Sequence, residues 1–303
     1  MQNILFLFVC IVIGMLLKKY LTKDDDSHLL LNQILIYVCL PAITLLHTTE
    51  TAFDVHYLLP MLMPWLSFGC SFLFFQWLDS YIHFHPHTKA VLILTAGIPS
   101  VSFVGFPIFE MLYGETGLEI GILMSQSGSF LVCSTLGVMV AAYYAAEVPS
   151  VKKMLIGVLT FPTFAVFCVA VLLNLLGFHL NSTFKDILEK LASPFGFLAL
   201  VSVGMQVPTS TDGWQVKNLK WGLAYKLLIT PLLIFILYGI VLAKKGIILE
   251  MSVLGAALGP MNTIAIIATN YKLNPTLASQ MVGIGIPISL VTIGILNEIL
   301  HLF

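Results

Sequence analysis

Long apolar runs alternate with short polar connections along the whole chain. A helix that crosses the hydrocarbon core of a bilayer needs about 20 mostly apolar residues. Ten runs come close to or exceed that length, so we predict an all-α membrane protein with ten transmembrane helices. These runs occupy residues 3–17, 29–46, 58–78, 90–112, 118–146, 154–176, 187–207, 219–243, 250–270 and 276–300.

The composition excludes several classes of protein. The 303 residues are 58% apolar and 10% charged, and their mean hydropathy is +0.98. Soluble domains carry about 45–50% apolar and about 25% charged residues. Cytosolic enzymes, secreted disulfide scaffolds and nucleic-acid-binding proteins are therefore excluded. The expected surroundings are a lipid bilayer, and no nucleic-acid partner is expected.

The basic residues predict an orientation. All fourteen are lysines and none is arginine, so an anion would have to be held by lysine, hydroxyl, amide or helix-end donors rather than by a bidentate guanidinium. Lysines favour cytoplasmic connections. Nine lie in odd-numbered connections and four in even-numbered ones, which predicts a multi-pass protein of the cell membrane with both termini outside the cytoplasm. The nine are Lys18, Lys19, Lys23, Lys89, Lys152, Lys153, Lys217, Lys220 and Lys272; the four are Lys185, Lys190, Lys244 and Lys245.

The chain divides near its middle into two halves of five predicted spans each. Because five is odd, two copies of one unit would lie in the membrane with opposite topology. Short motifs recur in the same order in both halves, which favours inverted repeats over residues 1–150 and 151–303. The matching motifs are Pro41 with Pro194, Gly97-Ile98-Pro99 with Gly259-Pro260, and Ser125-Gln126 with Ser279-Gln280. Inverted repeats are typical of secondary transporters.

The fourth and ninth predicted spans contain helix breakers at corresponding places. Two prolines and two glycines within residues 97–107 are incompatible with one continuous helix, because proline removes a backbone donor and clashes with the preceding turn. Broken backbone at membrane depth survives only where it is buried in protein or lines a cavity. We therefore predict a crossing of two broken helices with a substrate site around it. The candidate binding residues are Pro99, Ser100, Ser102, Gly105, Pro107, Gly259, Pro260, Asn262 and Thr263. The alternative interpretation is a pair of proline kinks that only shape packing.

The side chains at these breaks carry no Asp or Glu, which favours an anion or a neutral solute over a cation. Lys226 lies inside the eighth predicted span, five residues before Pro231. It is a candidate for balancing the charge of a bound anion; alternatively, its long side chain reaches the nearby interface. No catalytic motif is present, so we expect no enzyme activity, no catalytic residues, no cofactor and no metal site.

Several short motifs make the chain resemble the auxin efflux carrier family, which includes plant auxin exporters and bacterial malate-permease-like carriers. The motifs are Leu31-Asn32-Gln33, Leu40-Pro41-Ala42, Val104-Gly105-Phe106-Pro107, Tyr113-Gly114-Glu115, Ser193-Pro194, Ser202-Val203-Gly204-Met205, Lys226 with Pro231, Gly259-Pro260 and Asn270-Tyr271. The resemblance implies an inverted-repeat fold whose fourth and ninth helices cross at prolines. It also implies elevator-like transport of organic anions.

The sequence departs from the family at one site position, where Ser100 replaces a frequent asparagine. The large central cytoplasmic loop of the plant proteins is absent too. The resulting expectation is a secondary transporter of small organic anions such as malate or an auxin-like carboxylate, with a homodimer as one possible assembly. Two alternatives stay open: a sodium-coupled symporter of the bile-acid type, and a membrane receptor or sensor that transports nothing.

Overall fold

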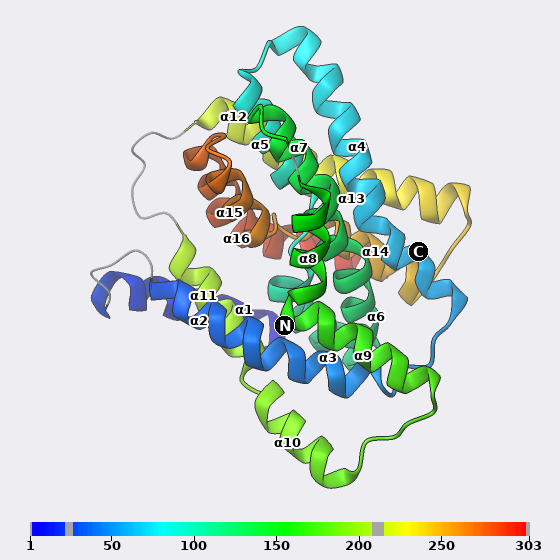
Figure 1. The fold of residues 1–303 in the computed structure, drawn as a ribbon. Helices are drawn as coiled ribbons and strands as arrows, with labels where there is room; N and C mark the ends of the chain where they lie inside the picture. The colour runs from blue at the N-terminus through cyan, green and yellow to red at the C-terminus, as the bar shows by residue number, and fades with distance from the viewer. Residues whose placement is uncertain (1, 22–26, 149, 208–214, 301–303) are drawn as a thin grey trace. The chain divides into compact units, whose positions relative to one another are not determined.

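The computed structural model describes residues 2–21, 27–148, 150–207 and 215–300 (Figure 1). The described residues are helical and contain no strand, apart from one isolated bridge. The helices fall into two compact units that interleave along the chain. Unit 1 contains residues 1–55, 102–122 and 155–207, and unit 2 contains residues 56–101, 123–154 and 208–303.

Unit 1 is built from the start of the first half, from a later segment of that half and from the first part of the second half. Two of its helices, α1 (Gln2–Leu21) and α11 (Phe195–Gln206), pack side by side (Figure 1). Their backbones approach closely at Gly14 and Gly204, where an added Cβ would collide with backbone of the other helix. Small residues allow such close helix pairs in membranes. The remaining elements are α2 (Ser27–Ile34), α3 (Leu40–Thr48), α6 (Phe106–Leu123), α8 (Val151–Thr160), α9 (Pro162–Leu175) and α10 (Ser182–Ala192).

A buried polar pair and a proline kink shape unit 1. The Ser202 hydroxyl donates to Asn32 Oδ1 at 2.6 Å, which links α11 to α2 through two buried side chains. The α8–α9 pair bends by 68° at Phe161, because Pro162 cannot continue the hydrogen-bond ladder of α8. The sixth predicted span is therefore a bent pair rather than a straight helix.

Unit 2 has a core centred on α5 (Pro86–Gly97), whose residues Ala90–Leu94 are fully buried. This helix packs against α4 (Leu58–Ile82) and α16 (Pro275–Leu300). The further helices are α7 (Val138–Tyr144), α12 (Val216–Ala224), α13 (Thr230–Ile234), α14 (Ile247–Ala257) and α15 (Asn262–Asn270). Wide π-helical segments join several of them, among them Met124–Phe130, Cys133–Gly137, Tyr225–Ile229 and Phe235–Val241.

By length and apolarity, six helices in the described part of the chain could cross a membrane, or seven if the bent α8–α9 pair is one span. This supports a multi-pass membrane protein, and the number of ten spans stays a prediction. One of the six, Val101–Tyr144, contains Gly114 with φ +61° and ψ −148°, which interrupts the helical geometry of α6. Each unit draws on both predicted halves. An inverted repeat is a symmetry relation between two segments, and a division into compact units does not test it. The repeats over 1–150 and 151–303 therefore also stay a prediction. Met1, Lys23 and Phe303, on which the orientation partly rests, lie outside the described residues.

Candidate functional site

Unit 2 brings the breaks of the fourth and ninth predicted spans together. After α5 the backbone leaves helical geometry over residues 98–100, and after α14 it does so over residues 258–261. Ile98 is extended, with φ −111° and ψ 114°, as expected for a residue that precedes a proline. An antiparallel bridge joins Pro99 to Pro260. We call this meeting of residues 98–100 and 258–261 the crossover.

Two backbone hydrogen bonds hold the crossover. Ser100 N donates to the carbonyl oxygen of Gly259 at 2.9 Å, and Met261 N donates to the carbonyl oxygen of Ile98 at 3.0 Å. Backbone that has left a helix in an apolar interior must find partners elsewhere. Each non-helical segment therefore supplies a hydrogen-bond partner for the backbone of the other. This pairing holds Ser100 beside the start of α15.

Asn262, the first residue of α15, lies at the crossover with its amide unsatisfied. The residue is 8% exposed, and neither its Nδ2 nor its Oδ1 has a hydrogen-bond partner among the described residues. Its neighbour Thr263 is half-buried. No side chain caps α15 at Met261, so the N–H groups of its first turn point out of the helix at its positive end. This helix end therefore offers several hydrogen-bond donors.

Lys226 lies in the π-helical turn after α12 and is fully buried, with 0% exposure. Within the described part of the chain its Nζ has no hydrogen-bond partner. The interpretation that this side chain reaches the interface does not fit its complete burial. An isolated buried amine is costly unless something pairs with it.

The packing of α12 shows that Lys226 follows a residue close to the crossover. Leu223, three residues earlier, approaches Gly285 of α16, and the ring of Pro260 approaches the same glycine. Residues three apart in a helix are separated by about one turn. Lys226 therefore lies about one turn along the chain from a residue that packs beside Pro260 of the crossover, in the same unit as Asn262.

The other three candidates, Ser102, Gly105 and Pro107, belong to unit 1 and are buried. The prediction that Pro107 breaks the helix is wrong, because residues 101–113 are continuously helical. The π-helical turn Val101–Gly105 directly precedes Pro107. Such a wide turn gives room for a proline, which lacks an N–H and would clash with a regular preceding turn. The interruption is confined to residues 98–100.

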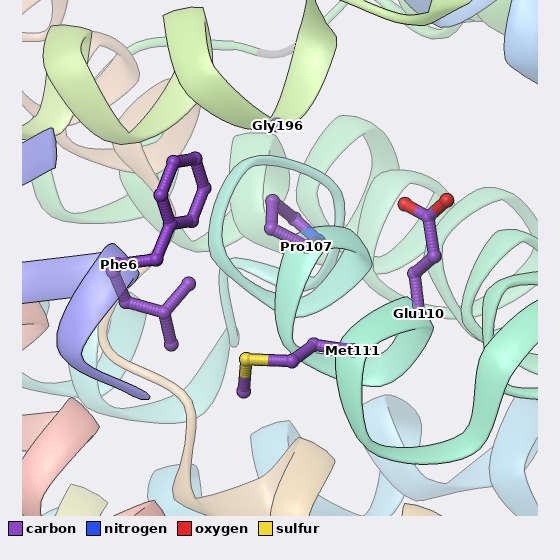
Figure 2. Close-up of a pocket in the computed structure, with 6 residues that line it drawn as sticks. Phe6, Pro107, Glu110, Met111 and Gly196 are labelled. Atoms are coloured by element: carbon purple, nitrogen blue, oxygen red, sulfur yellow. The ribbon is translucent and has the colours of Figure 1, made fainter. Parts of the chain in front are cut away.

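Pro107 lines a pocket of about 240 Å³ in unit 1. Figure 2 shows Pro107 and Met111 of α6 on one side of the pocket and Phe6 of α1 on the other, with Glu110 at the right and Gly196 of α11 above them in this view. The lining is mainly apolar and contains a single carboxylate. It offers no donor to an anion, unlike the crossover in unit 2.

Comparison with known proteins identifies the family. A family model described as membrane transport protein matches residues 1–296. The chain belongs to the membrane transport protein family. This is the family of the auxin efflux carriers, as the sequence motifs indicated.

Relatives of this membrane transport protein match it over nearly its full length. An uncharacterized transporter of Methanocaldococcus jannaschii is 23% identical over 99% of this chain and 98% of its own. An uncharacterized transporter of Methanothermobacter thermautotrophicus is 22% identical with the same coverage. An uncharacterized transporter of Escherichia coli K12 is 23% identical over 89% of this chain and 88% of its own. The family points to a transporter rather than an enzyme.

Two polar residues of this membrane transport protein were missed as site candidates. Gln126 and Ser129 are buried, and Gln126 Oε1 and Ser129 Oγ lack hydrogen-bond partners among the residues that the structure describes. Their segment runs past the crossover, since Met124 contacts Gly255 of α14 and Gly137 packs against Ile98 and Ile264. The signal was available in the sequence, because polar side chains inside a membrane helix are rare and often functional.

Proposed function

We propose that this membrane transport protein moves small organic anions across the cell membrane by alternating access, with the substrate bound at the crossover of unit 2. The substrates would be carboxylates such as malate or an auxin-like acid. The binding residues would be Pro99, Ser100, Gly259, Pro260, Asn262 and Thr263, all of them in unit 2. The remaining candidates, Ser102, Gly105 and Pro107, belong to unit 1 and are not part of this proposed site. Lys226 would balance the substrate charge.

The observation that carries this proposal is the set of unsatisfied donors around one helix break. Asn262 has a buried amide without a partner, and Lys226 has a buried amine without one, among the described residues. Buried polar groups are normally hydrogen-bonded. A carboxylate supplies what both lack, since it accepts from the amide and compensates the ammonium charge.

The absence of carboxylates near the break supports an anion over a cation. In α5, α15 and the segment between α14 and α15 the sequence contains no Asp or Glu. Acidic side chains at this depth are the usual ligands of transported cations and protons. Helix α15 adds the positive end of its dipole at Asn262, which favours a negative ligand.

Alternating access would move the crossover between the two sides of the membrane. The division into two compact units supports a movement in which unit 2 carries the bound substrate as one body, as in an elevator. Lysine counts support termini outside the cytoplasm. A cysteine placed at either terminus should then react with an impermeant reagent from outside intact cells, and one placed in residues 147–153 should not.

The function is tested with purified protein in two steps. A panel of mono- and dicarboxylates is screened for a rise in thermal midpoint, because a ligand of the native state stabilises it. Carboxylates that bind are then assayed for flux into proteoliposomes, with and without a sodium gradient. Flux that is independent of sodium supports the proposal. Binding without flux would favour a receptor, and strictly sodium-dependent flux would favour the symporter.

A further inference from the structure

A pocket in unit 2 lies at the start of α14, the helix that leads into the crossover at its other end, and none of the crossover residues lines it. It has a volume of about 290 Å³, just below the range of about 300–1,000 Å³ that is typical of small-molecule sites. Its apolar part is lined by Phe235 and Ile240 of the last π-helical segment, Leu249 of α14 and Leu300 of α16. Phe235 and Ile240 lie in the last turns of one apolar helix and Leu249 lies in the first turn of the next, while Leu300 is the last residue of α16. The pocket therefore lies where the chain passes from one hydrophobic segment to the next.

Two lysines stand on the connection that borders this pocket. Lys244 and Lys245 line it together with Glu250 of α14. Lys244 is half-buried and Lys245 is exposed. Neither lysine forms an ion pair with any residue that the structure describes. The lining therefore combines an apolar floor with two free ammonium groups and one carboxylate.

The backbone fixes where these lysines stand. Ala243 has φ +49° and Gly246 has φ +66°, so left-handed residues lie on both sides of the pair. Lys244 N also donates to the carbonyl oxygen of Tyr238 at 2.9 Å. A non-glycine residue with positive φ is uncommon and persists only where the surroundings hold it. Lys244 and Lys245 thus lie in a short connection whose backbone conformation is fixed by these contacts.

The same lysines are exceptions to the charge distribution along the chain. They belong to the four that lie in even-numbered connections, against nine in odd-numbered ones. Another of the four, Lys185, forms an ion pair with Glu50. The connection of Lys244 and Lys245 offers no such protein partner among the described residues, but it does border a pocket.

We propose that this pocket binds an anionic phospholipid, with the phosphodiester at Lys244 and Lys245 and the start of an acyl chain on the apolar floor. Two lysines and one glutamate leave a net charge of +1, which complements a headgroup with one net negative charge such as phosphatidylglycerol. The position at the end of one apolar helix and the start of the next suits a molecule whose headgroup and chain part at the membrane interface. The same phosphate chemistry could come from a soluble phosphate ester, and the experiment separates these two sources.

The test uses the full chain purified in detergent. Dioctanoyl phosphatidylglycerol is titrated, and bound lipid is counted by native mass spectrometry while the thermal midpoint is followed. Each lysine near anionic lipid contributes about 1 kcal/mol, so Lys244→Gln combined with Lys245→Gln should weaken binding about thirtyfold. The matched control is Lys152→Gln with Lys153→Gln, an adjacent pair that is equally charged and exposed at the start of α8; this variant should bind like the parent.

Three outcomes would overturn the proposal. The first is equal binding by the Lys244/Lys245 double variant and the parent. The second is equal binding of dioctanoyl phosphatidylcholine and phosphatidylglycerol, since the charge would then not matter. The third is stabilisation by glycerol 3-phosphate alone at the same concentration, which would assign the pocket to a soluble ligand. If the double variant folds poorly, Lys245→Gln alone, at an exposed position, should still weaken binding about fivefold. None of these readouts involves carboxylate flux, so they are independent of the proposed function.

Discussion

Two regions of unit 2 each contain a lysine with little exposure to solvent. In one region the ammonium group has partners within the protein, and in the other it has none among the described residues. In the first turn of α5, the Lys89 side chain is 14% exposed. It donates to two residues near the end of α4, to Asp79 Oδ2 at 2.8 Å and to Gln76 Oε1 at 3.1 Å. Asp79 Oδ1 accepts from the backbone N–H of Phe84 at 2.7 Å. The Gln76 amide in turn donates to the Tyr144 hydroxyl. Every charge in this region has a partner within the protein.

Around the crossover, by contrast, buried polar groups lack hydrogen-bond partners among the described residues. Lys226 is fully buried and Asn262 is 8% exposed, yet neither Nζ nor the amide atoms have a partner within the described residues. Both regions are within one compact unit and one fold. The difference shows that burial alone does not identify a binding site. A satisfied network stabilises the fold, whereas the donors left without partners beside a helix break are the basis of our proposal that a substrate binds there.

The largest effect should come from Lys226→Met, which removes the buried amine that has no partner among the described residues. We expect carboxylate binding to weaken by about 10- to 150-fold, the worth of a hydrogen bond to a charged group. The thermal midpoint should not fall, because no protein partner loses its bond. Flux and calorimetry on the purified variant measure this. Lys220→Met, on the exposed side of α12, is the matched control and should behave like the parent; a similar loss in both variants would contradict the comparison.

Lys89→Met should lower the stability of the protein and leave carboxylate binding almost unchanged. It leaves Asp79 without its cation, so the free energy of unfolding should fall by about 1.5–3 kcal/mol. Carboxylate affinity of the folded protein should stay within about twofold. Combining it with Asp79→Asn in a double-mutant cycle isolates the pair. A loss of binding with unchanged stability would place Lys89, not Lys226, in the functional region.

Asn274→Ala tests a second satisfied region at a smaller scale. Asn274 Oδ1 accepts from Leu277 N at 3.2 Å and caps α16, while its Nδ2 donates to Thr88 Oγ1 at 3.0 Å. Loss of a cap costs about 0.5–2 kcal/mol, and the thermal midpoint should drop accordingly. Asn270→Ala, exposed at the end of α15, provides the baseline. Equal midpoints for the two variants would show that the cap contributes nothing.

The smallest effect should come from the ion pair of Lys185 with Glu50 in unit 1. The two side chains are 32% and 40% exposed, and exposed pairs contribute about 0–1 kcal/mol. Lys185→Ala should therefore change the free energy of unfolding by less than about 1 kcal/mol, and less still in high salt. A loss as large as that of Lys89→Met would remove the distinction between exposed and buried pairs.

The sequence predicted the crossover well because its cause is local. Proline and glycine act on their own backbone, so Gly97-Ile98-Pro99 and Gly259-Pro260 marked the two breaks within a residue or two. The same reasoning overestimated Pro107, because a preceding π-helical turn accommodates it. Hydropathy patterns do not report the width of a helical turn. The bend at Pro162, by contrast, was readable in principle from the proline alone.

Pairing between distant residues could not be predicted. Lys89 meets Asp79 and Gln76 only because α4 and α5 pack together, and Ser202 meets Asn32 across 170 residues. The sequence places Lys89 in a connection and Lys226 inside a span, but it does not show that Lys89 finds partners and that Lys226 finds none among the described residues. The candidate role of Lys226 came from its place inside an apolar span, and its burial is a finding of the structure.

The most direct test of the account is the affinity of a transported carboxylate for Asn262→Ala, measured by titration calorimetry beside the parent and Asn270→Ala. The amide of Asn262 is buried and unsatisfied at the crossover, so its removal should cost the substrate about 1–3 kcal/mol. The account predicts binding about 5- to 150-fold weaker than in the parent, a smaller loss for Ser100→Ala, and no change for Asn270→Ala. Binding of Asn262→Ala and Ser100→Ala within about twofold of the parent would contradict the assignment of the substrate site to the crossover.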